Sequence, residues 1–68
     1  MRNPKRINEF CNRLKAAWSA MPDMRFGQLI ENVNDFIASG FGIFYIEDDK
    51  LIERIEEYVA EIQLEMKE

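Results

Sequence analysis

The residues of this sequence best suited to chemistry form two short polar stretches, and the first of them is acidic. Glu47, Asp48 and Asp49 make the densest run of carboxylates outside the last predicted helix. Carboxylate oxygens bind Mg²⁺ or Ca²⁺, but this run lacks the alternating ligands, central glycine and distal glutamate of a calcium loop. Acidic side chains are also favoured at a helix N-terminus, where they cap amides and interact with the helix dipole. The run therefore predicts the beginning of a helix, capped by Asp48 or Asp49, in preference to a metal site.

The second polar stretch contains Asp23, Arg25 and Gln28. An arginine beside free helix amides is able to bind a phosphate or a carboxylate. Here Asp23 already places a carboxylate at the positive end of the second predicted helix, and neither an anion-binding loop nor a second base accompanies Arg25. We therefore expect Asp23 to cap that helix and Arg25 to pair with an acid of residues 47–49.

Two residue counts exclude common catalytic machinery. The chain contains no histidine and one cysteine. It therefore has no imidazole base, no serine–histidine triad, no histidine metal ligand and no internal disulfide, which fits a reducing compartment. The cysteine, Cys11, falls on an apolar stripe and is expected in the core. These counts predict a protein that is not an enzyme, needs no cofactor and has no small-molecule substrate.

Length and composition are typical of a small globular protein. The 68 residues are 47 % hydrophobic and 32 % charged, which predicts one helical domain over residues 1–68. No apolar run approaches the roughly 18 residues that span a membrane, and the N-terminus lacks a signal-peptide core. We expect a soluble, cytoplasmic protein with no membrane partner.

Apolar residues recur at spacings of three and four in three segments. This periodicity predicts an all-α fold, a compact three-helix domain with helices over about residues 4–21, 24–39 and 48–65. Asn3 is placed to cap the first helix, and Pro4 suits its first turn. The predicted core positions are Ile7, Phe10, Cys11, Leu14, Ala17, Trp18 and Met21, then Phe26, Leu29, Ile30, Val33, Phe36 and Ile37, then Ile52, Ile55, Val59, Ile62 and Met66.

The glycines of the second helix and of the segment after it have separate roles. Gly27 costs a helix about 1 kcal/mol relative to alanine, so we expect Trp18 or Tyr45 to lie close over it. Ser39, Gly40 and Gly42 are expected to end the helix, with one glycine in the left-handed conformation.

Residues 41–47 form an aromatic and β-branched run that joins the second and third helices. Such a run has strand propensity, but a single strand has no partner within this chain. We expect an extended connector that inserts Phe44 and Ile46 into the core. Strand pairing between two copies of the chain is the alternative.

Charge is divided unevenly along the sequence. Residues 1–25 carry six basic and two acidic side chains, a balance of +4, whereas residues 26–68 carry three basic and eleven acidic ones, a balance of −8. This division predicts pairing of the basic first helix with the acidic last helix before it predicts an external partner.

A nucleic-acid partner is the alternative use of the basic first helix. Lys5, Arg6, Arg13 and Lys15 would contact phosphates on its exposed side, as in a small nucleic-acid-associated or phage regulatory factor. The acidic last helix and the isoelectric point of about 4.8 argue against this alternative.

Two blocks of the sequence carry a resemblance. A Pro-Asp-Met-Arg-Phe-Gly-Gln-Leu-Ile-Glu-Asn block follows Trp18 at residues 22–32, and a Phe-Tyr-Ile-Glu-Asp-Asp block occupies residues 44–49. With these blocks and its Met-Arg-Asn-Pro start, the chain resembles a family of short, uncharacterised bacterial and bacteriophage proteins over about residues 1–57. The resemblance implies a small, soluble, helical protein and no established activity.

The resemblance also implies that the two blocks meet in space. Arg25 or Gln28, beside Asp23, would then reach Glu47 or Asp48 and form a polar junction. Such a junction is either a network that fixes the fold or a surface that binds a partner.

The sequence favours a non-enzymatic protein–protein interaction module. The last predicted helix is long and amphipathic, and its far end is expected to extend past the shorter helices and to expose Tyr58, Ile62 and Met66 to a protein partner or to a second copy. The methionines are scattered along the sequence and do not predict a common recognition face.

Overall fold

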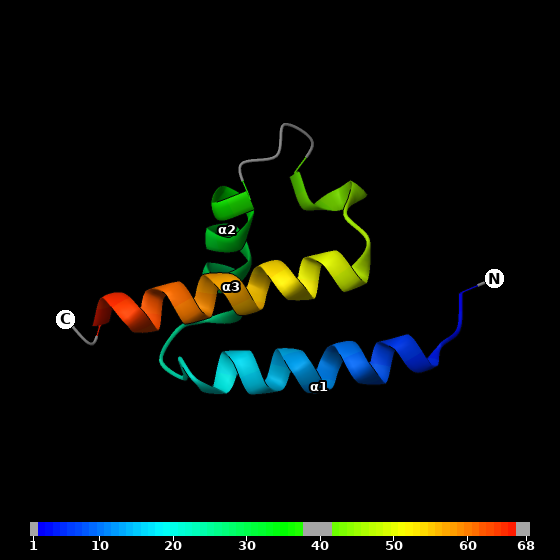
Figure 1. The fold of residues 1–68 in the computed structure, drawn as a ribbon, viewed down its shortest axis with the longest axis horizontal. Coiled ribbons are helices and arrows are strands. Elements are labelled where there is room, and N and C mark those ends of the chain that lie inside the picture. The colour runs from blue at the N-terminus through cyan, green and yellow to red at the C-terminus, as the bar shows by residue number, and fades with distance from the viewer. Residues whose placement is uncertain (1, 38–41, 67–68) are drawn as a thin grey trace.

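Four helical elements account for most of the chain. The computed structural model describes residues 2–37 and 42–66 and places in them α1 (Lys5–Ser19), α2 (Phe26–Ile37), the 3-10 helix η1 (Gly42–Tyr45) and α3 (Asp48–Met66) (Figure 1). The predicted all-α class and the three predicted helices are confirmed. Their bounds differ from the predicted ones by about two residues, except that the predicted end of the second helix, at residues 38–41, lies outside the described residues.

The beginning of α1 follows the sequence prediction. The Oδ1 atom of Asn3 accepts a hydrogen bond from the backbone N–H of Lys5 at 2.9 Å. Pro4 already has helical angles, with φ −64° and ψ −15°. Asn3 therefore caps the helix and Pro4 occupies the first turn, where its missing N–H costs nothing.

The caps of α2 and α3 differ from the prediction by one or two residues. Arg25, and not Asp23, directly precedes α2, because its carbonyl accepts the first helical hydrogen bond from Leu29 at 3.0 Å. Its N–H donates to Oε1 of Gln28 at 3.0 Å, which is one half of a capping box. Glu47 takes the corresponding place before α3, where its carbonyl accepts the N–H of Leu51 at 2.9 Å.

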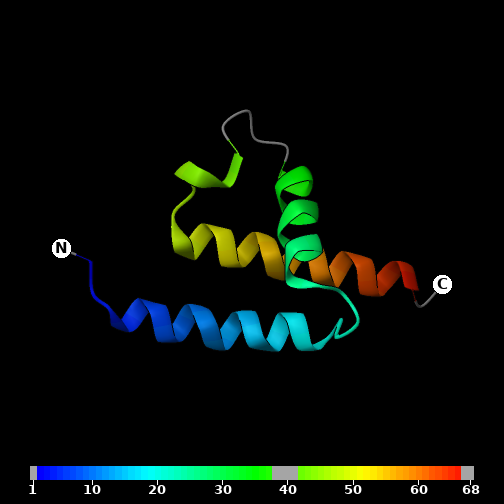
Figure 2. The same ribbon diagram turned by 180° about the vertical axis from the view of Figure 1, so that it is seen from behind.

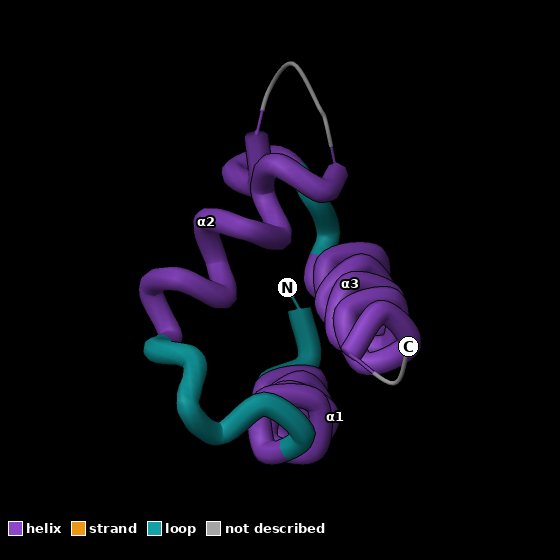
Figure 3. The backbone as a smooth tube through the Cα atoms, turned by 90° about the vertical axis from the view of Figure 1, so that its left-hand side faces the viewer, coloured by secondary structure: helices purple, strands orange, loops and turns teal. Residues whose placement is uncertain are grey.

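The helices α1 and α3 lie side by side and run in the same direction. Both go from right to left in Figure 1, and α2 crosses them near the C-terminal half of α1. The view from behind and the end-on view agree that α2 lies against one side of this pair (Figures 2 and 3). The long connection through α2 and η1 returns the chain to the end where α1 began, which makes the parallel arrangement possible.

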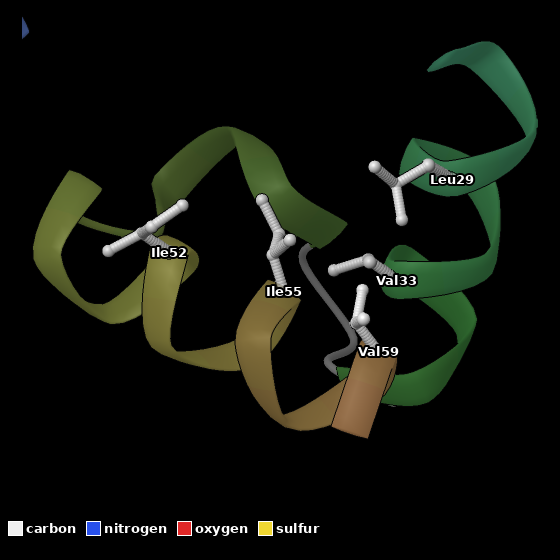
Figure 4. Packing of buried hydrophobic residues seen from close by; sticks show 5 residues of the cluster. All are labelled: Leu29, Val33, Ile52, Ile55 and Val59. Carbon is white, nitrogen blue, oxygen red and sulfur yellow. The ribbon is translucent and has the colours of Figure 1, made fainter. Parts of the chain in front are cut away.

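The fully buried core is small and comes from α2 and α3. Leu29 and Val33 meet Ile52, Ile55 and Val59, and all five are at most 4 % exposed (Figure 4). Within the described residues α1 contributes no fully buried side chain. Its inner face is half-buried against the core through Phe10, Leu14, Ala17, Trp18 and Met21.

The prediction for Cys11 is wrong, because this residue is exposed. It lies on the edge of the α1 stripe and borders a shallow cleft with Leu14 and Trp18. A stripe therefore identifies the apolar face of a helix, but it does not show which positions at its edge are buried.

The segment between α2 and α3 also differs from the prediction. Residues 42–45 form a 3-10 turn and not an extended connector, and the described ranges contain no strand. Phe44 is 84 % exposed and is not inserted into the core, whereas Ile46 is half-buried. Gly42 adopts a φ of +68°, which turns the chain sharply where a strand would have to continue.

Gly27 has no close neighbour, contrary to prediction. Apart from its chain neighbours and the backbone of its own helix, a Cβ atom at this position would have no neighbour within 4 Å. The indole of Trp18 packs on the ring of Phe26 instead, with ring centroids 5.3 Å apart. The glycine is therefore not required by packing.

No helix in residues 2–37 or 42–66 is both long enough and apolar enough to cross a membrane.

Candidate functional site

The predicted polar junction is not assembled in the structure. Arg25 and Gln28 hydrogen-bond to each other at the beginning of α2, whereas Glu47 and Asp48 pair with residues near the N-terminus. Asp23 takes part in no ion pair within the described part of the chain. The two sequence blocks therefore lie at different ends of the molecule: α2 begins near the end of α1, and α3 begins near its start (Figure 1).

Three ion pairs, which we call the ion-pair ladder, join the N-terminal segment and α1 to Glu47 and to α3. Arg2 contacts Glu47 at 3.0 Å, Arg6 contacts Asp48, and Arg13 contacts Glu56 through both carboxylate oxygens. The partners are separated by 45, 42 and 43 residues. A nearly constant separation is the signature of two parallel helices in register. The predicted complementarity between the basic first helix and the acidic last helix is confirmed by these pairs.

The contact between Arg13 and Glu56 is the strongest electrostatic feature of this ladder. Hydrogen bonding from the Arg13 guanidinium lowers the pKa of the Glu56 carboxyl below its usual value of 4.5. The same hydrogen bond raises the pKa of Arg13 above its usual value. Both side chains remain more than a third exposed, so the pair orients the helices more than it stabilises them.

The ion-pair ladder uses two of the four basic side chains that were predicted to contact nucleic acid. Arg6 and Arg13 are held by carboxylates of α3. Lys5 and Lys15 form no ion pair with any residue that the structure describes. In the same ranges no group of three or more potential metal ligands is present.

The residues of the predicted interaction surface on α3 have different environments. Tyr58 packs against the core, and its ring meets that of Phe36 edge to face at 5.7 Å. Ile62 is half-buried, and Met66 is 76 % exposed. Of the large apolar side chains of α3, those that are exposed lie on its last turns, where Leu64 is 67 % exposed.

A cleft that the sequence did not predict lies between the α1–α2 loop, α2 and the end of α3. Its volume is about 470 Å³, and its chemically distinctive lining residues are Met21, Met24, Met66, Asp23, Glu31 and Gln28. We call it the methionine cleft. Met21 and Met24 precede α2 and Met66 ends α3, so no sequence spacing relates them, and only the fold brings them together.

Trp18 positions one wall of the methionine cleft. Its indole N–H donates to the carbonyl of Met24 at 2.7 Å. Since the backbone of the loop is tied to α1 in this way, Met24 is held half-buried beside Met21. Trp18 is therefore a packing and positioning residue, as its place on the apolar stripe predicted.

Two other hollows flank exposed apolar side chains. A shallow apolar cleft on α1 is lined by Cys11, Leu14, Lys15, Trp18, Ser19 and Pro22. At the other end of the molecule, Phe44 borders a hollow with Ile30 and Ile43, and its ring meets that of Tyr45 edge to face at 4.8 Å.

Comparison with known proteins identifies no relative: no protein-family model, no curated protein and no solved structure matches the chain. The resemblance to short bacterial and bacteriophage proteins therefore stays a prediction.

Proposed function

We propose that this chain is a non-enzymatic protein–protein interaction module. The observation that carries the proposal is its accessible surface of 5450 Å². A folded monomer of 8.1 kDa is expected to expose about 4,500 Å². The excess means that the chain is less compact than a typical monomer of its size and leaves more of its surface open to a partner.

The dimensions of the molecule agree with this excess. The Cα radius of gyration is 12.4 Å, where about 11 Å is expected for a domain of this length. The principal extents are 45 × 28 × 18 Å. In this elongated arrangement α1 lies on the outside, and some apolar side chains stay exposed to solvent. A partner would cover them.

The exposed apolar side chains gather toward the two ends of α3. Among the residues that the structure describes, the large ones are Ile7, Phe26, Phe44, Tyr45, Leu64 and Met66. Phe44 and Tyr45 project from η1 near the beginning of α3, and Leu64 and Met66 lie on its last turns, which extend past the end of α1 (Figure 1). We propose these last turns as the contact for a protein partner or for a second copy of the chain.

The nucleic-acid alternative has less support. Two of its four candidate basic residues, Arg6 and Arg13, are already paired with carboxylates. The whole chain also carries a net charge of −4. Phosphate binding would have to break these pairs or depend on Lys5 and Lys15 alone.

Sedimentation together with site-specific cross-linking tests the proposal. We expect a photoreactive residue at position 64 to cross-link to a defined protein, or to a second copy, in the native host. The matched control is position 12, an exposed polar position on α1. The proposal is contradicted by a chain that stays monomeric to about 1 mM, where association of about −4 kcal/mol would be visible, and that cross-links at position 64 no more than at 12.

A further inference from the structure

We infer that the methionine cleft binds a basic amphipathic helix of another protein. The inference rests on the proposed function, because it assigns a chemical class to the partner of an interaction module. The cleft shares Met66 with the proposed contact on the last turns of α3, whereas Phe44 and Leu64 do not line it.

The three methionines that line the cleft suit apolar anchor side chains. Met66 is 76 % exposed, and Met21 and Met24 are half-buried beside it. Methionine is unbranched and polarizable, so a methionine lining adapts to leucine, phenylalanine or tryptophan anchors of different shape. A volume of about 470 Å³ also falls in the range of ligand-binding clefts.

The rim of the cleft selects for positive charge. Asp23 and Glu31 line it, and neither takes part in an ion pair within the described residues. Among residues 2–37 and 42–66, no lysine or arginine lines the cleft. Arg25, the base nearest in sequence to Asp23, is outside it. The shallow cleft on α1 is different, because its charged lining residue is Lys15.

Charge complementarity decides which occupant fits best. A lysine or arginine beside the apolar anchors of a helix would meet Asp23 and Glu31 while the anchors contact the methionines. A second copy of this chain fits less well: its net charge is −4, and carboxylates of α3 hold Arg6 and Arg13. The net charge would also steer a basic partner toward the molecule.

Fluorescence anisotropy with two synthetic peptides tests the inference. One labelled peptide is a helix with leucines on one face and lysines on the other, and its counterpart replaces every lysine by glutamate. We expect the lysine peptide to bind the full chain at least about ten times more tightly than the glutamate peptide, with an affinity that falls as salt is added.

Two double variants separate the cleft from the general charge of the molecule. Asp23→Lys with Glu31→Lys should weaken binding of the lysine peptide by about tenfold or more. Asp35→Lys with Glu61→Lys makes the same change in net charge at exposed positions outside the cleft. This control should change the affinity by less than about threefold. Equal losses in the two variants would overturn the inference, because binding would then depend on net charge alone.

A third variant tests the methionines that line the cleft. Met66→Gln keeps the length of the side chain and should not affect folding, because Met66 is largely exposed. We expect this substitution to weaken binding of the lysine peptide by about fivefold or more and to leave the helical circular dichroism spectrum unchanged. An unchanged affinity would exclude the cleft as the binding site. Self-association of the wild-type chain that Met66→Gln abolishes would assign the cleft to a second copy and overturn the inference.

The failures of the two proposals are distinguishable. Equal binding of the lysine and glutamate peptides would overturn the basic partner and leave the interaction module intact. Absence of binding by either peptide would also overturn the inference. The proposed function would fail only with the monomeric, uncross-linked result described above.

Discussion

Gly27 and Gly42 are the same residue type in opposite situations. Gly42 adopts φ +68°, and a Cβ atom there would lie 3.3 Å from Oδ1 of Asn34. Gly27 lies inside α2, near its beginning, where a Cβ atom would enter open space. The first glycine is required by the backbone, whereas the second only lowers helix propensity.

Alanine at these two positions should therefore have opposite effects on stability. We expect Gly27→Ala to raise the free energy of unfolding by up to about 1 kcal/mol. Gly42→Ala should lower it by about 1–2 kcal/mol, because alanine is strained in the left-handed conformation. Urea unfolding followed by circular dichroism measures both. A destabilised Gly27→Ala variant would mean that a neighbour does pack against this position.

At the scale of the helices, the ion-pair ladder specifies how α1 and α3 pair. Arg2, Arg6 and Arg13 contact acids 42 to 45 residues further along the chain. An antiparallel arrangement would bring basic residues at the start of α1 to the far end of α3 and break this register. The exposed pairs contribute little energy each, so their main effect is on the direction and alignment of the helices.

Glu56 should make the stability of this helix pair depend on pH. Its folded-state pKa lies below the ordinary value of 4.5, so its contribution is complete above that value and is lost as the pH falls through the lowered pKa. The stability difference between wild type and Glu56→Gln should therefore be small but measurable at pH 7 and should disappear toward pH 3. Thermal melts from pH 7 to pH 3 check this, with Glu61→Gln as the control.

The helices could be predicted from the sequence because each carries a stripe at helical spacing. The same stripes could not predict which positions are covered. Cys11 is exposed at the edge of the α1 stripe, and Phe44 is 84 % exposed on a connector in which Gly42 adopts a φ of +68°. The methionine cleft was also beyond sequence reasoning, since Met24 and Met66 belong to segments that meet only in the fold.

At the scale of the whole molecule, burial is distributed unequally among the helices. The fully buried side chains belong to α2 and α3, and within the described residues α1 has none. Ile7 is 52 % exposed although it lies on the same stripe as Leu14, because α2 crosses the other half of α1 (Figures 1 and 2). The first half of α1 is therefore held mainly by exposed ion pairs and by Phe10.

Native-state hydrogen exchange should reveal this division. We expect the slowest amides in α3 around Ile55 and Val59 and in α2 at Val33, where exchange requires global unfolding. Amides of residues 8–11 should exchange through local opening, which has a lower free energy than global unfolding. Added salt should lower this opening free energy further, because salt screens the ion pairs of Arg2 and Arg6. Equal exchange free energies in α1 and α3, unaffected by salt, would show that the three helices unfold as one unit.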